Sequence, residues 1–228
     1  MLFQPTILRC EDGFILQRIV IFANGDLPNL DKARGLLRAD DFFICADGGT
    51  RHALALGLTP NLVIGDMDSI QKDQWQSLEK AGVAIELFPR DKNETDLELA
   101  ITKAIEFKPV EIVIVAALGG RLDQTFGNIA LLTDSRLATF DVVLDDGTEE
   151  MFICRNQVQV HGRSGDIVSL IPWGNSVHGI QTQGLKWALN NEMLHPDKTR
   201  GISNEMLGET ASIHIASGNL LMIHTRKS

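Results

Sequence analysis

The chain has 228 residues, of which 44% are hydrophobic and 22% charged, and its formal net charge is −9. This length suits one large or two modest globular domains. An acidic chain is a poor non-specific partner for nucleic acid or an anionic membrane, so a phosphate-bearing ligand would need a divalent cation. No apolar run approaches the ~20 residues of a membrane span, and the first residues do not resemble a secretory signal.

The cysteines bear on the redox setting. There are three, Cys10, Cys45 and Cys154, and they are widely spaced with no CxxC pattern. Cys45 and Cys154 stand in apolar runs, as small core residues do. We therefore expect a reducing, cytoplasmic setting rather than a disulfide framework.

Short apolar runs alternate with helical patterns through the first two thirds of the chain. The expected strands are residues 18–23, 42–46, 62–64, 83–88, 111–117 and 140–144. The expected helices are residues 30–39, 50–56, 70–81, 96–107 and 124–133, with Thr95 and Asp123 at N-cap positions of the last two. Several strands are apolar throughout, as strands buried on both faces are. We expect an α/β, Rossmann-like domain over residues 1–146, with a parallel sheet and helices on both faces.

The pattern changes near Gly147, after which no convincing helix is found. Short strand-like runs cover residues 157–161, 166–171, 179–183, 210–216 and 220–225. Ser217-Gly218-Asn219 predicts a hairpin between the last two runs, and the polar stretch 190–209 predicts a loop. We expect a smaller all-β sandwich domain over residues 147–228.

Aspartates stand in the loops that follow five of the expected strands. They are Asp26, Asp47, Asp66, Asp68, Asp96 and Asp123. The carboxyl ends of parallel strands share one edge, where such folds bind ligands. Two carboxylates one residue apart, as at Asp66 and Asp68, repel each other unless a cation lies between them, and Mg²⁺ prefers oxygen ligands. The pair predicts a Mg²⁺ site, although Asp68, Thr95 and Asp123 taken singly are also typical helix caps.

Glycine pairs and an arginine accompany these carboxylates. Gly48-Gly49 and Gly119-Gly120 each stand between a strand and a helix, where glycine lets backbone N–H groups approach a phosphate. Such glycines are also common for reasons of turn geometry alone. Arg121 adds a forked donor suited to phosphate oxygens. The P-loop, GxGxxG, HExxH and GxSxG patterns are absent, which leaves a nucleotide-type site built on carboxylates, glycines and one arginine.

At these residues the sequence resembles the thiamine pyrophosphokinase family, roughly from Ile19 to Thr225. The matching stretches are residues 46–49, 65–69, 92–100, 119–123, 184–187 and 203–205. Each motif is weak alone, but their order and spacing together are specific. The resemblance implies transfer of the pyrophosphoryl group of ATP to the hydroxyl of thiamine, giving thiamine diphosphate and AMP. It also implies a homodimer with sites between subunits.

The resemblance also implies roles for particular residues. Mg²⁺ and the pyrophosphate would be held by Asp66, Asp68 and Asp96, and either Asp96 or Asp47 could accept the hydroxyl proton. The ATP side would be lined by Asn24, Gly25, Asp47, Gly48, Gly49, Lys92, Thr95, Gly119, Gly120, Arg121 and Asp123. Thiamine would stack on Trp187 of the partner subunit, with Ser203 and Asn204 nearby. The sequence departs from the family pattern at Asn93, Gln124 and Ala188, where Asp, His and Pro are usual.

Two other functions stay open on the sequence. One is a related pyrophosphokinase acting on another hydroxymethyl heterocycle, such as a pterin, for which the departures at Gln124 and Ala188 leave room. The other is a non-catalytic protein that binds thiamine or a nucleotide. The presence of four residues argues against it: Asp66, Asp68, Asp96 and Arg121. Trp187 taken alone is more often a packing residue.

Overall fold

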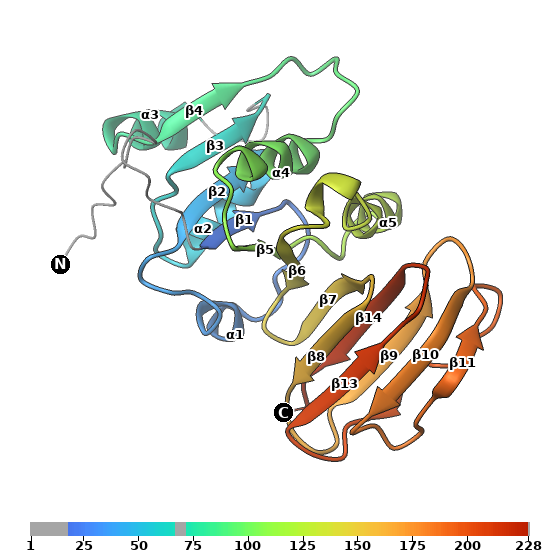
Figure 1. Cartoon of the computed structure of the whole chain (residues 1–228). Coiled ribbons are helices and arrows are strands. Elements are labelled where there is room, and N and C mark those ends of the chain that lie inside the picture. The colour runs from blue at the N-terminus through green and yellow to red at the C-terminus, as the bar shows by residue number, and fades with distance from the viewer. Residues whose placement is uncertain (1–17, 67–71, 228) are drawn as a thin grey trace. The chain divides into compact units, whose positions relative to one another are not determined.

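The computed structural model describes residues 18–66 and 72–227, and Figure 1 traces the chain through them. The chain divides into two compact units, the first ending at Leu144 and the second beginning at Asp145. None of the helices in the described ranges is long and apolar enough to cross a membrane.

Six parallel strands form the sheet in the described part of the first unit, in the order β6-β5-β1-β2-β3-β4. They are β1 (Arg18–Phe22), β2 (Phe42–Ala46), β3 (Leu62–Gly65), β4 (Ala84–Leu87), β5 (Glu111–Val115) and β6 (Asp141–Asp145). All five residues of β1 are buried, because this strand pairs on both edges, with β2 and β5. Such a strand needs apolar side chains on both faces, and its sequence after the first residue supplies them.

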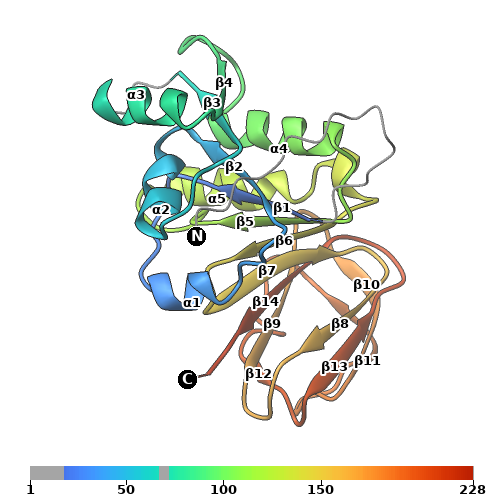
Figure 2. The same ribbon diagram turned by 90° about the vertical axis from the view of Figure 1, so that its left-hand side faces the viewer.

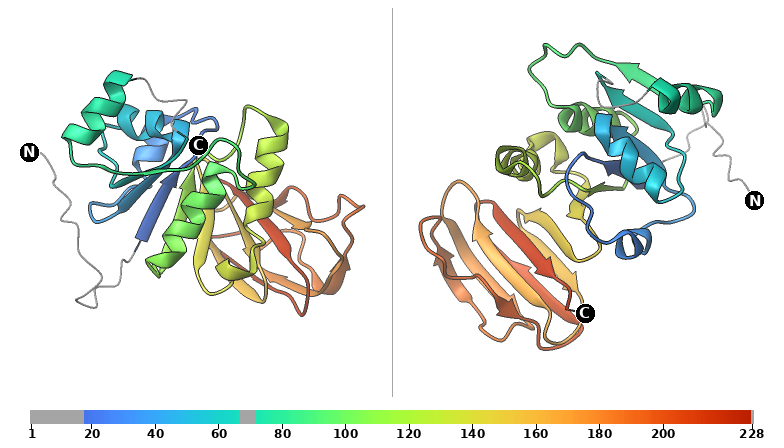
Figure 3. Two further views of the ribbon diagram at one scale, coloured as in Figure 1. Left: turned by 90° about the horizontal axis from the view of Figure 1, so that it is seen from above. Right: turned by 180° about the vertical axis from the view of Figure 1, so that it is seen from behind.

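Helices cover both faces of this parallel sheet. They are α1 (Leu30–Arg34), α2 (Thr50–Ala55), α3 (Lys72–Lys80), α4 (Asp96–Glu106) and α5 (Leu122–Leu131). The helices α1, α2 and α3 lie on one face, and α4 and α5 lie on the other (Figures 2 and 3). Right-handed crossovers require this division, because the chain moves outward from β1 to β4 and then returns to add β5 and β6 on the other side. The direction of travel reverses between β1 and β5, the point at which open α/β sheets bind ligands.

The helix boundaries differ from those expected, most clearly at the end of the first helix and at the start of α5. The first helix ends earlier than predicted, at Arg34, because Gly35 follows as its C-cap. The helix α5 begins at Leu122, so Arg121 is its N-cap residue, and the expectation that Asp123 caps this helix is wrong. Asp123 lies in the first turn instead, where a carboxylate still interacts favourably with the helix dipole.

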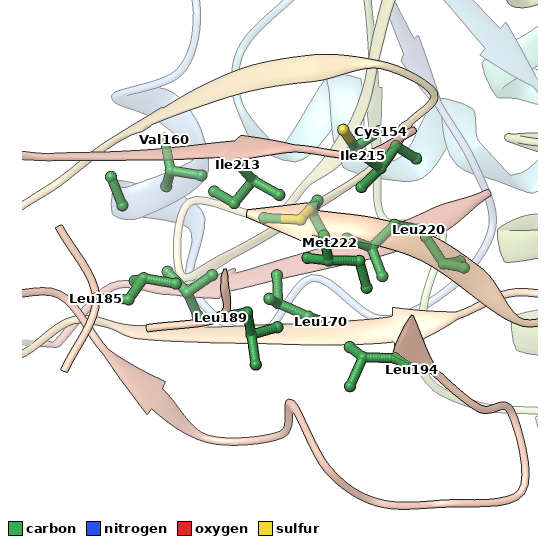
Figure 4. Packing of buried hydrophobic residues seen from close by; sticks show 14 of the residues in the cluster. Cys154, Val160, Leu170, Leu185, Leu189, Leu194, Ile213, Ile215, Leu220 and Met222 are labelled. Atoms are coloured by element: carbon green, nitrogen blue, oxygen red, sulfur yellow. The ribbon is translucent and has the colours of Figure 1, made fainter. Parts of the chain in front are cut away.

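The second unit contains two antiparallel sheets within the described residues. The orders are β12-β9-β14-β7 in one sheet and β11-β10-β13-β8 in the other. The strands are β7 (Glu149–Cys154), β8 (Gln157–His161), β9 (Ile167–Pro172), β10 (Val177–Gln183), β11 (Asn190–Leu194), β12 (Asn204–Glu205), β13 (Thr210–His214) and β14 (Leu220–Thr225). Apolar side chains from both sheets form one buried cluster (Figure 4), in which Leu170 and Met222 of the first sheet meet Ile213 of the second. This cluster is the core of the unit.

Two expectations for this unit are wrong. The stretch 190–209, expected as a loop, contains β11 and β12. The sequence of β11 is polar because Leu194 is its only buried residue, so it lacks the alternation that marks a strand. The turn at Ser217-Gly218-Asn219 closes no hairpin, because β13 pairs with β8 and β10 whereas β14 pairs with β7 and β9. This turn carries the chain from one sheet to the other.

Candidate functional site

A cleft of about 580 Å³ opens in the first unit at the carboxyl ends of its strands. The segments that line it follow β1, β2, β3, β4 and β5, as the shared edge of a parallel sheet predicts. Charged side chains line this cleft in the part of the chain that the structure describes. The acidic ones are Asp26, Asp47, Asp66, Glu94 and Asp96, and the basic ones are Arg51, Arg90, Lys92 and Arg121. The cleft thus combines carboxylates suited to a cation with cations suited to phosphate.

The structure brings most of the nucleotide-site residues expected from the sequence to this cleft. Those in its lining are Asn24, Gly25, Asp47, Asp66, Lys92, Thr95, Asp96, Gly119, Gly120 and Arg121. Gly48, Gly49 and Asp123 are not part of the lining. Asp68 lies outside the described residues, so its position is not part of this arrangement.

The loop after β1 packs tightly against the loop after β5. The backbone N–H groups of Gly25 and Asp26 each donate a hydrogen bond of 2.7 Å, to the carbonyl oxygens of Ala116 and Leu118 respectively. A Cβ atom on residue 25 would lie 2.3 Å from the Leu118 oxygen, so only glycine permits this approach. The backbone N–H of Gly120 donates to Asp26 Oδ2 at 3.0 Å, so the Asp26 carboxylate holds the glycine turn after β5.

The Gly48-Gly49 pair brings the segment after β2 against β1. A Cβ atom on Gly49 would lie 2.0 Å from the carbonyl oxygen of Phe22, and one on Gly48 would lie 2.5 Å from the side chain of Asn24. Both glycines are buried. The geometry therefore gives this pair a packing role, one that fixes where the Asn24 side chain lies.

Carboxylates gather around Gly65 at the end of β3. A Cβ atom on Gly65 would lie 2.8 Å from Asp47 Cβ and 3.3 Å from Asp96 Oδ1, and Asp66 is the next residue along the chain. Asp47 is buried with a φ of 40°, a left-handed conformation that is uncommon outside glycine. The Lys92 ammonium pairs with Asp96 Oδ1 at 2.8 Å. The donors are oxygen atoms, as Mg²⁺ prefers, although the described residues include no group of three close enough to form a complete metal site.

Thr95 places the start of α4 at the cleft. Its Oγ1 accepts a hydrogen bond from the backbone N–H of Glu98 at 3.2 Å, which is the N-cap interaction expected from the sequence. Thr95 also lines the cleft, so its capping role and its place in the site occur together. The N-terminus of this 11-residue helix carries a partial positive charge that favours anions.

Arg51 and Arg90 line the cleft but were not predicted from the sequence. Arg51 lies in the first turn of α2, and Arg90 lies in the loop between β4 and α4. Both follow strand ends closely, which is the signal that could have identified them.

The second unit contains a smaller cavity of about 320 Å³ beside Trp187. Its lining residues are Trp187, Ala188, Leu189, Arg200, Gly201, Ile202 and Asn204. The Trp187 side chain is exposed, with a relative solvent accessibility of 55% for the residue, which is unlike a tryptophan that serves packing. The Lys186 ammonium lies 4.7 Å from the centroid of this ring, so one cation already contacts its π-system.

Asn204 fixes the backbone of Trp187. Its Oδ1 accepts from the N–H of Trp187 at 3.0 Å, and its Nδ2 donates to the carbonyl oxygen of the same residue at 2.7 Å. Asn204 is itself buried, so these bonds are shielded from water. Ser203, with a φ of 60°, is not part of the cavity lining, and its N–H donates to Ser169 Oγ at 3.0 Å.

Two family models match consecutive parts of the chain. One is described as thiamin pyrophosphokinase, catalytic domain, and matches residues 33–144. The other is described as thiamin pyrophosphokinase, vitamin B1 binding domain, and matches residues 155–220. A thiamine pyrophosphokinase of Bacillus subtilis is 30% identical over 212 residues, which are 92% of this chain and 99% of that protein. This chain belongs to the thiamine pyrophosphokinase family.

Solved thiamine pyrophosphokinase structures share its architecture. The enzymes from Bacillus subtilis and Geobacillus thermodenitrificans give TM-scores of 0.83 and 0.81 at 28% and 27% identity. The alignments cover 93% of this chain and 100% and 99% of those chains. The mixed α/β fold is therefore that of the thiamine pyrophosphokinases.

A third kind of relative shares a shorter stretch. The 6-hydroxymethyl-7,8-dihydropterin pyrophosphokinase of Pyrococcus furiosus is 33% identical over 78 residues, only 32% of each chain. The thiamine pyrophosphokinase models, in contrast, reach both the charged cleft and the Trp187 cavity. The similarity to a pterin enzyme is thus local, whereas the similarity to thiamine pyrophosphokinases extends through both units.

Proposed function

We propose that this chain transfers the pyrophosphoryl group of ATP to the hydroxyl of thiamine, giving thiamine diphosphate and AMP. Membership of the thiamine pyrophosphokinase family supports an ATP-dependent pyrophosphotransferase. The observation that carries the proposal is the cleft, in which carboxylates and cations from five loops meet where the strand order reverses between β1 and β5. ATP would occupy this cleft, and thiamine would bind at Trp187.

Each substrate would bind to one of the two domains expected from the sequence. Residues 1–146 would form a Rossmann-like nucleotide domain, which the parallel pairing of β1 to β6 supports. Residues 147–228 would form a thiamine-binding β-sandwich, which the two antiparallel sheets and their shared apolar cluster support. The buried thiols of Cys45 and Cys154 are in keeping with the reducing cytoplasm.

Mg²⁺ would be held at the end of β3 by Asp66 and Asp96, together with Asp68, which lies outside the described residues. The fit rests on the oxygen donors around Gly65 and on the acidity of the cleft, which opposes ATP unless a cation is present. When bound, Mg²⁺ neutralises charge on the phosphates.

The chain's own residues would position the reactants and handle the proton. Phosphoryl-type transfer needs in-line placement and charge neutralisation more than covalent help from the protein. Arg121 and Lys92 would bind the phosphates, each leaving the carboxylate with which it pairs here. Asp47 or Asp96 would accept the proton of the thiamine hydroxyl. The permanent charge of the thiazolium ring suits the exposed face of Trp187.

Nucleotide analysis after incubation with Mg-ATP tests the reaction. The acceptors are thiamine and a 6-hydroxymethyl pterin, the second chosen because of the local similarity to a pterin enzyme. AMP formed with thiamine and not with the pterin supports the proposal. AMP formed only with the pterin, or no AMP with either acceptor, contradicts it.

We also propose a homodimer in which Trp187 of one subunit serves the ATP cleft of the other. Mixing an Asp66→Asn variant with a Trp187→Ala variant tests this arrangement, because each heterodimer then contains one intact site. With independent sites and random exchange, activity should recover to about a quarter of the wild-type total. Differentially tagged subunits establish that exchange has occurred. Exchange without recovery beyond the two parent variants would contradict the shared site.

A further inference from the structure

Arg51 forms hydrogen bonds to the loop that follows β1. Its guanidinium donates to Asn24 Oδ1, to the Asn24 carbonyl oxygen at 3.2 Å and to the Gly25 carbonyl oxygen at 2.9 Å. The neighbouring His52 places its Nε2 2.9 Å from the same Gly25 oxygen. Gly48 leaves the space that the Asn24 side chain fills. Consecutive residues at the start of α2 therefore fix the position of this loop.

The contact from His52 does not need a charged imidazole. Burial lowers the pKa of His52, and the Gly25 carbonyl and the Asp26 carboxylate oppose this effect only in part. A neutral ring that faces a carbonyl oxygen carries its proton on the facing nitrogen, so Nε2 donates to Gly25. The fixed positive charge at the start of α2 is thus that of Arg51.

Arg51 differs from other cations of the cleft in its partners. Lys92 pairs with Asp96 at 2.8 Å, and Arg121 pairs with Asp123. The three hydrogen bonds of Arg51 all go to neutral carbonyl oxygens, and none of the ion pairs among the described residues includes it. Its charge therefore remains available to an anion in the cleft that it lines.

The loop that Arg51 holds also supports the opposite wall of the cleft. Gly25 and Asp26 bond to Ala116 and Leu118 after β5, and the Asp26 carboxylate accepts from the N–H of Gly120. Contacts therefore run without a break from α2 through the loop after β1 to the glycine turn after β5. Loosening the first contact would loosen both walls where the strand order reverses.

We propose that Arg51 is a positioning residue for the nucleotide: it orders the Asn24–Gly25 loop and adds an uncompensated positive charge facing the phosphates. This inference rests on the proposed function, because it takes ATP as the occupant of the cleft. Arginine suits the role because its planar fork can reach several carbonyl oxygens at once, whereas a lysine ammonium is a point charge.

Binding of Mg-ATP in the absence of thiamine, measured by calorimetry, tests the inference. We expect Arg51→Met to weaken binding about tenfold or more, since it removes both the charge and the loop contacts. Arg51→Lys should fall between Arg51→Met and the wild type, because it restores the charge alone. The matched control is Arg34→Met, which removes an exposed arginine of α1 that pairs with Asp31 and does not line the cleft. This control should bind within twofold of the wild type.

Steady-state kinetics separates positioning from general damage to the fold. Arg51→Met should raise KM for ATP about tenfold while KM for thiamine stays within twofold, a split that loss of folded protein does not produce. If Arg51→Met does not fold, the comparison of Arg51→Lys with the wild type takes its place. Equal ATP affinity in the wild type and the folded Arg51 variants overturns the inference. A wild type that binds ATP more tightly than Arg51→Met but forms no AMP with thiamine overturns the proposed function and not the role of Arg51.

Discussion

Replacing His224 by glutamine should remove a buried positive charge from the core of the second unit. His224 is fully buried on β14, with Nδ1 2.9 Å from Glu150 Oε1 and Nε2 3.2 Å from Asp166 Oδ2. A carboxylate faces each ring nitrogen, which favours the charged imidazolium, because only that form can donate a hydrogen bond from both ring nitrogens. Burial acts to lower the pKa of His224 and Arg226 also opposes the charge, yet the two carboxylates outweigh them and raise the pKa above its usual value.

The sign of the pH dependence follows from that raised pKa. A group with a higher pKa in the folded chain than in the unfolded chain stabilises the fold fully below the unfolded value, about 6.5 for histidine. Its contribution is lost as the pH rises through the folded value. The stability supplied by His224 should therefore be complete at pH 6 and decline at alkaline pH.

The loss of unfolding free energy in His224→Gln depends on which contacts of Asp166 and Glu150 remain. Two hydrogen bonds between charged groups contribute about 1.5–3 kcal/mol each. Asp166 would still accept from the backbone N–H groups of Arg163 and Lys227, and Glu150 would keep its pairing with Arg226. We therefore expect a loss of about 3 kcal/mol at pH 6, the low end of the range for breaking a buried ion pair.

Urea unfolding of the full chain at pH 6 and pH 9, followed by tryptophan fluorescence, measures the difference. The His224→Gln variant should have a lower free energy of unfolding than the wild type at pH 6, and this difference in free energy should be smaller at pH 9. His161→Gln, at an exposed position on β8, is the control and should match the wild type at both values. If the two proteins have the same free energy of unfolding at pH 6, or if the difference between them is the same at pH 6 and pH 9, the assignment of a charged His224 is refuted.

Three further outcomes are expected. Gly49→Ala should lower the free energy of unfolding by about 3 kcal/mol or more, because the new methyl group would lie 2.0 Å from a backbone oxygen of β1. Gly127→Ala is the control and should cause no such loss, because the space around Gly127 is open. Thermal melts of both variants measure the difference. Asn204→Ala should raise KM for thiamine more than KM for ATP, because it frees the Trp187 backbone; equal changes in both constants would argue against this. Burial raises the pKa of the Cys45 thiol to about 12, so iodoacetamide at pH 8 should modify it only after denaturation, and rapid labelling of the native chain would contradict this.

The carboxylates of the cleft could be placed from the sequence because their position depends on topology alone. Parallel strands end at one edge, so Asp47, Asp66 and Asp96 were expected together before any side-chain geometry was known. Arg51 could not be placed in this way. Whether a residue in the first turn of a helix faces the cleft or the solvent depends on the rotation of that helix, which the tight packing of Gly49 against β1 determines.

The second unit shows where local patterns fail. The turn at Ser217-Gly218-Asn219 carries a hairpin signal, but that signal does not report which strands the flanking segments will join. The partners of β13 and β14 are set by the apolar cluster between the two sheets, which is a non-local property. The polar strand β11 was missed for a related reason, because its place depends on pairing with β10 rather than on its own periodicity.

The adjacency of β1 and β5 has a consequence for how the chain acquires its proposed nucleotide site during synthesis. The central strand of the sheet emerges first, yet one of its two partners begins only at Glu111, and the cleft lining extends to Asn128. A nascent chain that ends before these residues lacks the pairing of β1 with β5 and part of the cleft lining, so it lacks the site proposed for ATP. Since ATP would bind only the completed unit, nucleotide at about 100 times its Kd would stabilise that unit by about 2.7 kcal/mol. Cellular ATP would then serve as a folding ligand as well as a substrate.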